Sequence, residues 1–333
     1  MMEVDHDTEA EETFYSTDND SAIEMGSSRT STYSMTSSVA ERLEENGRTY
    51  HSYKDGKYLL PNDEAELNRL DIQHKMWEIT LDGNLHLAPI GPSPHYLNSG
   101  GISNRCSDRY RPVAYTARIV SQPQTGAKPA EEEKNKREKT LTDPRTSVPQ
   151  NCEFQIDDAE DEWLFSRPFD YIHGRACATC FKRPEEIFRK AFDALRPGGW
   201  FEMQDLNLQT SEDGSIEGTT LKVIQNEIHG ALASVGMRWD NVPRYAAWMR
   251  AVGFEEVTEV VLRWPSNPWW PADPKEKTLG TWFLGQIQTG VLESVTTRIF
   301  MTKLGWSKDR LDEFLVRAKR DLNDPKIKAY SPV

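Results

Sequence analysis

The amino-acid sequence predicts an α/β protein with a doubly wound, mainly parallel sheet, which is readable from about Asn151 to Trp264. Short apolar runs of strand length alternate there with longer amphipathic runs of helical period. Proline and glycine mark the boundaries, above all at Arg196–Gly199 and at Gly253. Strands that alternate with helices form parallel sheets covered on both faces.

The predicted elements follow one another in chain order. The strands are Cys152–Ile156, Phe169–His173, Trp200–Gln204 and Glu256–Trp264, and the helices are Glu185–Leu195, Leu221–Val235 and Val242–Val252. Apolar residues then recur near helical spacing between Pro271 and Lys319. Residues 151–333 are therefore expected to form the sheet domain together with a C-terminal helical cover.

Three segments of different composition precede this domain. Residues 1–45 are acidic and rich in Ser and Thr, and we expect a disordered tail because they have too few aliphatic side chains to bury. Residues 46–92 are expected to form an ordered segment that packs on the core. Within it, Pro61-Asn62-Asp63 is a capping signal that precedes an amphipathic helix. Residues 93–150 show no readable alternation of strands and helices, and we interpret them as an aberrant or disordered segment.

Charge and hydropathy exclude several classes of function. The formal charge of -13 disfavours a nucleic-acid partner, because the neutralisation of phosphates needs an excess of Lys and Arg. No apolar stretch approaches the roughly 20 residues that a membrane-spanning helix needs, and the polar start lacks the apolar region of a signal peptide. We expect an intracellular protein, in the cytoplasm or the nucleus, with no membrane partner.

The four cysteines are too few for a disulfide framework in a chain of 333 residues. Cys177 and Cys180 form a C-x-x-C pair that is compatible with a redox couple or with half of a zinc site. No second pair of ligands has the matching spacing, so we predict no metal site. The plainest interpretation is two small residues near the start of a helix.

Several stretches together resemble the LaeA-like, or TAM-domain, fungal methyltransferases. The matching stretches are Tyr50–Tyr58, Leu60–Asp63, Leu81–Ile90, Asp157–Glu160 with Trp163, Phe169–Arg175, Leu195–Asp205, Leu304–Ser307 and Ala329–Val333. The resemblance implies a class I methyltransferase (Rossmann-like) fold with S-adenosylmethionine (SAM) as the cofactor. It further implies that the helices after Pro271 cover the acceptor side of the cleft.

The resemblance also implies a set of cofactor-binding residues. Asp158 and Ala159 come just after a strand, where a carboxylate is a suitable acceptor for the adenine amino group. The residues alone explain Asp158 equally well as the N-cap of a helical turn. His173, Gly174 and Arg175 end the next strand and are expected to line the cofactor, whereas their plain alternative is a solvated loop.

The resemblance assigns Asp143 to the ribose hydroxyls. Asp205 also stands at a strand end, where a cap or turn is the common role. Catalytic residues stay unknown, because the methyl group of a sulfonium is already activated and positioning supplies most of the catalysis.

The implied function is SAM-dependent methyl transfer, linked to fungal secondary metabolism or its regulation, with a small molecule or a protein as the acceptor. The alternative is a noncatalytic relative that acts as a regulatory or binding protein in a complex.

The glycine motif of the family, similar to Leu-Asp-Ile-Gly-Thr-Gly-Thr-Gly-Ile-Trp, is missing. With permitted codons, reading Arg105–Val113 one nucleotide later yields Asp-Val-Arg-Thr-Gly-Thr-Gly-Leu-Trp. Our hypothesis is a frameshift or a misplaced splice boundary between about Gly91 and Thr142. Because the glycines let the backbone approach the cofactor, we expect the chain as it stands to bind SAM weakly or not at all.

Overall fold

The computed structural model describes residues 42–51, 60–91, 94–100, 115–119, 152–156 and 158–333. The predicted tail over 1–41, most of the segment over 93–150 and Asp143 lie outside the described residues. The last residues of the predicted tail, Arg42–Glu45, form strand β1, which pairs antiparallel with β2 (Arg48–His51).

A five-stranded sheet is the centre of the fold, in the order β5-β4-β3-β6-β7. Its strands are β3 (Tyr96–Gly100), β4 (Tyr115–Ile119), β5 (Cys152–Ile156), β6 (Phe169–Arg175) and β7 (Leu195–Gln204). β3, β6 and β7 run parallel, whereas β4 is antiparallel to both β3 and β5. The predicted α/β architecture is confirmed, with one antiparallel strand in a sheet expected to be mainly parallel.

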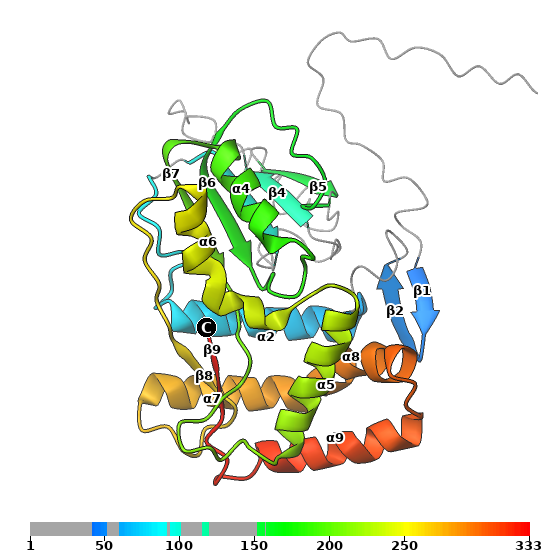
Figure 1. The fold of residues 1–333 in the computed structure, drawn as a ribbon. Coiled ribbons are helices and arrows are strands. Elements are labelled where there is room, and N and C mark those ends of the chain that lie inside the picture. The colour runs from blue at the N-terminus through cyan, green and yellow to red at the C-terminus, as the bar shows by residue number, and fades with distance from the viewer. Residues whose placement is uncertain (1–41, 52–59, 92–93, 101–114, 120–151, 157) are drawn as a thin grey trace, which may run out of the picture. The chain divides into compact units, whose positions relative to one another are not determined.

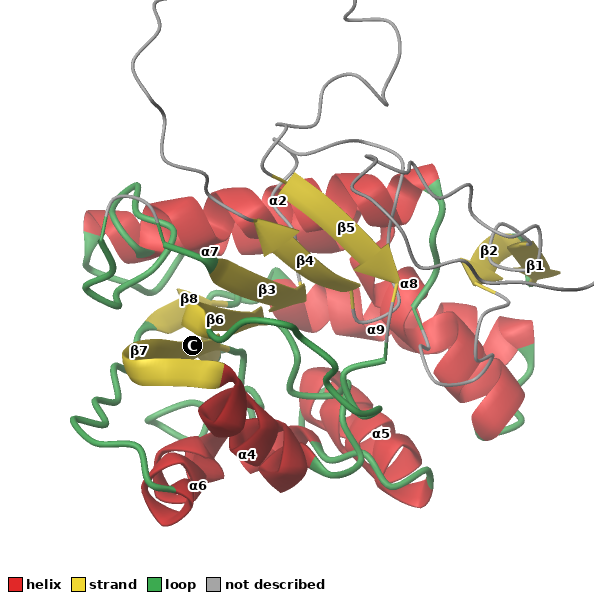
Figure 2. Cartoon of the chain, turned by 90° about the horizontal axis from the view of Figure 1, so that it is seen from above, coloured by secondary structure: helices red, strands yellow, loops and turns green. Residues whose placement is uncertain are grey.

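Helices α4 (Pro184–Ala194) and α6 (Tyr245–Val252) lie on one side of this sheet, and α2 (Glu64–Thr80) lies on the other (Figure 2). Proline at the first turn of α4 needs no backbone donor, and the buried Ile187, Phe188 and Ala191 share one face. The ring of Phe188 packs edge-on against Phe201 of β7. The predicted α4 therefore forms because its apolar stripe has the sheet to pack against.

The prediction for Glu256–Trp264 is wrong, since only β8 (Arg263–Pro265) is a strand in that range. β8 pairs with β9 (Tyr330–Pro332), away from the central sheet. Val260 and Val261 are 50% and 64% exposed, so the run has no partner that buries its apolar side chains. An apolar run forms a strand only where another strand edge accepts its hydrogen bonds.

The predicted strand Trp200–Gln204 also starts earlier, at Leu195. Arg196-Pro197-Gly198-Gly199, expected as a turn, belongs to the strand, with Gly198 at a φ of +78°. Two further strands, β3 and β4, lie in the range where the sequence shows no readable pattern.

Four further helices lie in the C-terminal third, namely α5 (Thr220–Ser234), α7 (Pro274–Gln286), α8 (Leu292–Thr297) and α9 (Lys308–Leu322), shown in Figure 1. Short π-helical turns flank α8, and Gly290 has a φ of +97° inside the first of them. These helices share one apolar cluster. The sequence predicts an apolar helical face between Pro271 and Lys319, and most of it is buried. Its buried residues are Leu279, Leu284, Ile287, Val291 and Leu292, whereas Trp282 is 37% exposed.

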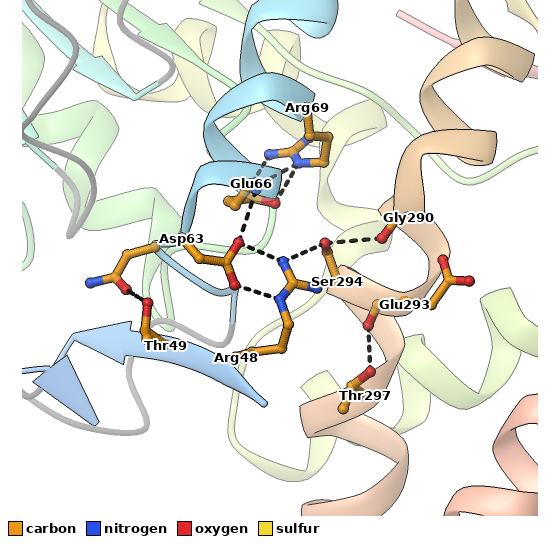
Figure 3. A network of polar contacts seen from close by, with 10 residues as sticks. Arg48, Thr49, Asp63, Glu66, Arg69, Gly290, Glu293, Ser294 and Thr297 are labelled. Atoms are coloured by element: carbon orange, nitrogen blue, oxygen red, sulfur yellow. Dashed lines mark hydrogen bonds and ion pairs between the residues drawn. The ribbon is translucent and has the colours of Figure 1, made fainter. Parts of the chain in front are cut away.

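An ion-pair network joins the N-terminal strands to these helices (Figure 3). Arg48 of β2 donates to both carboxylate oxygens of Asp63, at 2.5 and 2.8 Å, and to the hydroxyl of Ser294 in α8 at 2.9 Å. Asp63 also caps α2 by accepting the N–H of Glu66, as the sequence predicts. Glu66 is itself fully buried and pairs with Arg69 at 2.7 Å.

Because Asp63 is both an N-cap and an ion-pair partner, we expect Asp63→Ala to lower the free energy of unfolding by about 2 kcal/mol. Urea titration followed by tryptophan fluorescence measures this loss. The control is Asp312→Ala, which removes an exposed ion pair with Lys308 on α9. That change is expected to cost at most about 0.5 kcal/mol, and an equal loss in both variants contradicts the prediction.

Candidate functional site

The order in which strands are added to the sheet reverses between β3 and β6. From β3 the chain continues to β4 and β5 on one side, and then crosses to β6 and β7 on the other side. The carboxyl ends of β3, β6 and β7 lie at the same edge, because Gly100 pairs with Arg175 and Arg175 with Gln204. Open α/β sheets bind ligands outside the carboxyl ends of the strands at such a switch point. This edge is therefore the candidate site.

A row of polar side chains crosses the three parallel strands near this edge. Asn98, His173 and Glu202 are neighbours in register on β3, β6 and β7. The Nδ1 atom of His173 lies 2.7 Å from Oδ1 of Asn98. With that amide oxygen as the acceptor, Nδ1 carries the proton and Nε2 is left as an acceptor.

His173 is only 8% exposed, and its Nε2 atom makes no hydrogen bond of normal geometry within the described part of the chain. The side chain of Gln204 lies near enough to raise the pKa of His173 slightly, but its amide is already bonded to Arg175, Leu85 and Glu202. Burial, together with the charge of Arg175, lowers the pKa of His173 to about 4. The ring is therefore neutral at pH 7, with a buried lone pair that remains to be satisfied. An unsatisfied buried acceptor costs free energy, so it marks a position where a ligand donor is favoured.

Arg175 ends β6 and is held by the protein itself. Its guanidinium donates to Oε1 of Gln204 at 2.7 Å and to the carbonyl oxygen of Leu85 at 2.8 Å, and it lies 5.3 Å from the ring centroid of Trp77. Burial lowers the pKa of Arg175 to about 10, so it stays charged at neutral pH. These contacts fix the N-terminal segment to the carboxyl edge of the sheet, and the cofactor contact of Arg175 stays a prediction.

Glu202 holds the same segment from β7. Its carboxylate accepts the N–H groups of Leu87 and Ala88, at 2.9 to 3.0 Å, and the hydroxyl of Tyr171 at 3.1 Å. Burial raises the pKa of Glu202, but hydrogen bonds from Gln204 and from these N–H groups outweigh it and lower the pKa below its ordinary value. Glu202 is therefore a carboxylate that orders the loop beside the site.

Asp158 and Ala159 follow β5 and are both buried. The carboxylate of Asp158 accepts the N–H of Glu160 at 3.0 Å, and the carbonyl of Ala159 accepts the indole N–H of Trp163 at 2.9 Å. Ala159 also packs in one cluster with Cys177, so the turns after β5 and β6 are brought together. The carboxylate of Asp158 therefore closes a turn that does not continue into a helix, and its contact to adenine stays a prediction.

Gly174 has a reason of its own to be glycine. A Cβ atom at this position comes within 2.5 Å of the Met203 sulfur on the neighbouring strand. Glycine therefore leaves room for the Met203 side chain between β6 and β7, and a larger residue is expected to displace this flexible side chain.

Sequence reasoning missed Asn98, Glu202, Gln204 and Trp77 as parts of this site. One signal was available for two of them. Glu202 and Gln204 alternate with Phe201 and Met203 in a strand flanked by helices, and polar residues at alternate positions of a covered strand indicate a functional face.

The arrangement fits a nucleoside cofactor in two ways. The unpaired Nε2 atom of His173 is suited to a hydroxyl or ammonium donor, such as the ribose or the methionine part of SAM carries. Gly100 ends β3 at the switch point, where a residue without a side chain allows a ligand to approach the backbone. The ribose assignment of Asp143 falls outside the described residues.

Known proteins similar to this chain include methyltransferases. A family model described as a methyltransferase domain matches residues 102–259. The probable methyltransferase tdiE of Emericella nidulans is 31% identical over 89% of this chain and 88% of that protein. Methyltransferase pytC of Aspergillus terreus is 29% identical over 84% of this chain and 82% of that protein. The protein-methionine methyltransferase laeA of Emericella nidulans is 28% identical over 90% of this chain and 76% of that protein.

No helix in the described ranges is long and apolar enough to cross a membrane.

Proposed function

This chain belongs to the LaeA-like methyltransferase family, and we propose that it transfers a methyl group from SAM, bound at the switch point between β3 and β6, to an acceptor molecule. The observation that carries the proposal is the buried acceptor of His173 at that switch point, which has no partner among the described residues. SAM supplies an activated methyl group on a sulfonium, so the protein has mainly to position the two reactants.

The described residues divide this work between them. His173 accepts a hydrogen bond from the cofactor, and Asn98 holds its ring in the orientation that makes Nε2 the acceptor. Asp158 accepts from the adenine amino group beside the turn that it caps. Arg175 and Glu202 hold residues 85–88 against the carboxyl edge and thereby wall the site on the acceptor side.

The acceptor is a small molecule or a protein of fungal secondary metabolism. By methylating it, the protein makes secondary metabolites or regulates their production. Two kinds of relatives support this proposal: some are named methyltransferases, and others are named secondary metabolism regulators. Leu85 and Leu87 are 52% and 54% exposed on the loop that walls the site, where they offer an apolar contact to the acceptor. Cys177 and Cys180 are not joined in a disulfide, which suits the reducing cytoplasm or nucleus.

Isothermal titration with SAM, carried to millimolar concentrations, tests the binding part of this proposal. In the chain in which Arg105–Val113 is replaced by Asp-Val-Arg-Thr-Gly-Thr-Gly-Leu-Trp, so that SAM binding is measurable, we expect His173→Phe to weaken binding about tenfold. Phe keeps an aromatic ring at this position, and one buried hydrogen bond of about 1.4 kcal/mol is lost. The matched control is His229→Phe on α5, where the histidine pairs with Asp240 and lies outside the site. Equal affinities of the two variants contradict the assignment of His173.

Transfer of labelled methyl groups from SAM to fungal extracts tests the catalytic part. Label that enters a protein or a small-molecule fraction supports transfer and identifies the acceptor class. SAM binding without transfer favours the noncatalytic alternative.

A further inference from the structure

Cys177 and Cys180 lie in the turn between β6 and α4, which the proposed function does not use. The backbone N–H of Cys180 bonds to the carbonyl of Cys177 at 2.9 Å, so the turn folds back on itself. Neither cysteine is in a disulfide, Cys177 is 1% exposed, and Cys180 is half-buried. The two side chains pack in one cluster, and the thiol of Cys177 donates to the carbonyl oxygen of Arg175 at 3.3 Å. The proximity of Cys180, together with burial, raises the pKa of Cys177 well above its ordinary value.

A buried carboxylate faces this turn from β7. Asp205 is 5% exposed and accepts the backbone N–H of Ala178 at 2.9 Å and the hydroxyl of Tyr245 at 3.0 Å. Asp205 also accepts the backbone N–H of Cys177. The negative charge of Asp205 helps to raise the pKa of the Cys177 thiol. Burial raises the pKa of Asp205 to about 7, so near neutral pH it can both accept and release a proton.

We propose that Cys177 and Cys180 form a reversible disulfide by exchange with small disulfides such as oxidised glutathione, and that Asp205 takes the proton from Cys177. The inference concerns this turn alone and is independent of the proposed methyl transfer. A tetrahedral zinc site, the other use of C-x-x-C, needs four ligands. In the described ranges no group of three or more His, Cys, Asp and Glu side chains is arranged to hold a metal ion.

The exposures of the two thiols set the order of the steps. Cys180 is the more accessible, so its thiolate attacks the small disulfide, whose S–S bond breaks to release one thiol. Cys177 then passes its proton to Asp205, and its thiolate attacks the Cys180 sulfur of the mixed disulfide. The second small thiol leaves and takes up a proton. The protein loses two electrons and two protons, and the small disulfide gains them.

Mass spectrometry of the full chain in a Cys106→Ser/Cys152→Ser background tests the proposal, since only the two thiols of the turn remain. After incubation with oxidised glutathione and an acid quench, we expect a protein that has lost two hydrogens, and dithiothreitol is expected to restore them. A stable glutathione adduct, or two thiols that remain free, overturns the proposal.

Single variants in this background test the order of attack. Cys177→Ser is expected to trap glutathione on Cys180, because the resolving thiol is gone. Cys180→Ser is expected to leave Cys177 unmodified, because Cys177 is buried. The opposite pattern overturns the assignment of Cys180 as the attacking thiol.

Asp205→Asn tests the proton acceptor, because Asn keeps the side-chain oxygen that binds Ala178 but accepts no proton. We expect about tenfold slower closure of the mixed disulfide at pH 8, and loss of an inflection near pH 7 in the pH profile of closure. The other titratable groups that face Asp205 are Cys177 from the turn and Tyr245 from α6, and Cys180 lies beside both of these. Tyr245→Phe, which keeps the carboxylate, is the control. Closure without an inflection near pH 7 in the parent chain overturns the role of Asp205 even where the variant folds poorly.

Discussion

Replacement of Arg105–Val113 by Asp-Val-Arg-Thr-Gly-Thr-Gly-Leu-Trp is expected to tighten SAM binding by about two orders of magnitude. The glycine turn lets backbone N–H groups reach the cofactor, and two or three such hydrogen bonds at roughly 0.5–1.5 kcal/mol each correspond to this factor. Isothermal titration of the two proteins measures the change. The matched control carries the same replacement with Ala at both Gly positions, and it is expected to bind no better than the parent chain.

Asp158→Ala in the replaced chain is expected to weaken binding again, because the acceptor for the adenine amino group is lost. An unchanged affinity removes Asp158 from the site. Tight binding by the parent chain is the result that contradicts the whole prediction. In that case Gly100, at the end of β3, already contributes what the missing motif would supply.

Asp205→Asn is expected to change how stability depends on pH. Burial raises the pKa of Asp205 from 3.8 to about 7, so the folded state binds this proton more tightly than the unfolded state does. The stabilisation that this difference contributes is complete below pH 3.8 and is lost as the pH rises through about 7. At about 1.4 kcal/mol per pKa unit, the full difference corresponds to about 4 kcal/mol.

Asn does not titrate, so the variant is expected to gain stability relative to the parent chain between pH 4 and pH 8, by up to about 4 kcal/mol. Urea unfolding at several pH values in this range measures the difference. Glu313→Gln, an exposed carboxylate on α9, is the control and is expected to show no such trend. A stability difference that stays constant with pH contradicts the raised pKa.

Much of the fold follows from local pattern. Nearby residues in the sequence specify three of its elements: the strand around Phe169–His173, the helix over Pro184–Ala194 and the cap at Asp63. The family motif around Leu195–Asp205 likewise identified the strand that carries Glu202, although the strand begins before its Pro-Gly-Gly sequence. Candidate residues at the ends of strands were predictable for the same reason, because parallel strands place their carboxyl ends at one edge.

By itself, the sequence determined the class of the protein, its family and the strand ends at which a cofactor is expected. Only the tertiary structure decided that Tyr96–Gly100 is the central strand and that Glu256–Leu262 is no strand. It also decided that Arg175 bonds to Leu85 and that Glu202 bonds to Leu87, partners 90 and 115 residues away in the chain. The physical reason is that strand pairing and buried polar contacts depend on which distant groups satisfy each hydrogen bond, and a local sequence pattern does not contain that information.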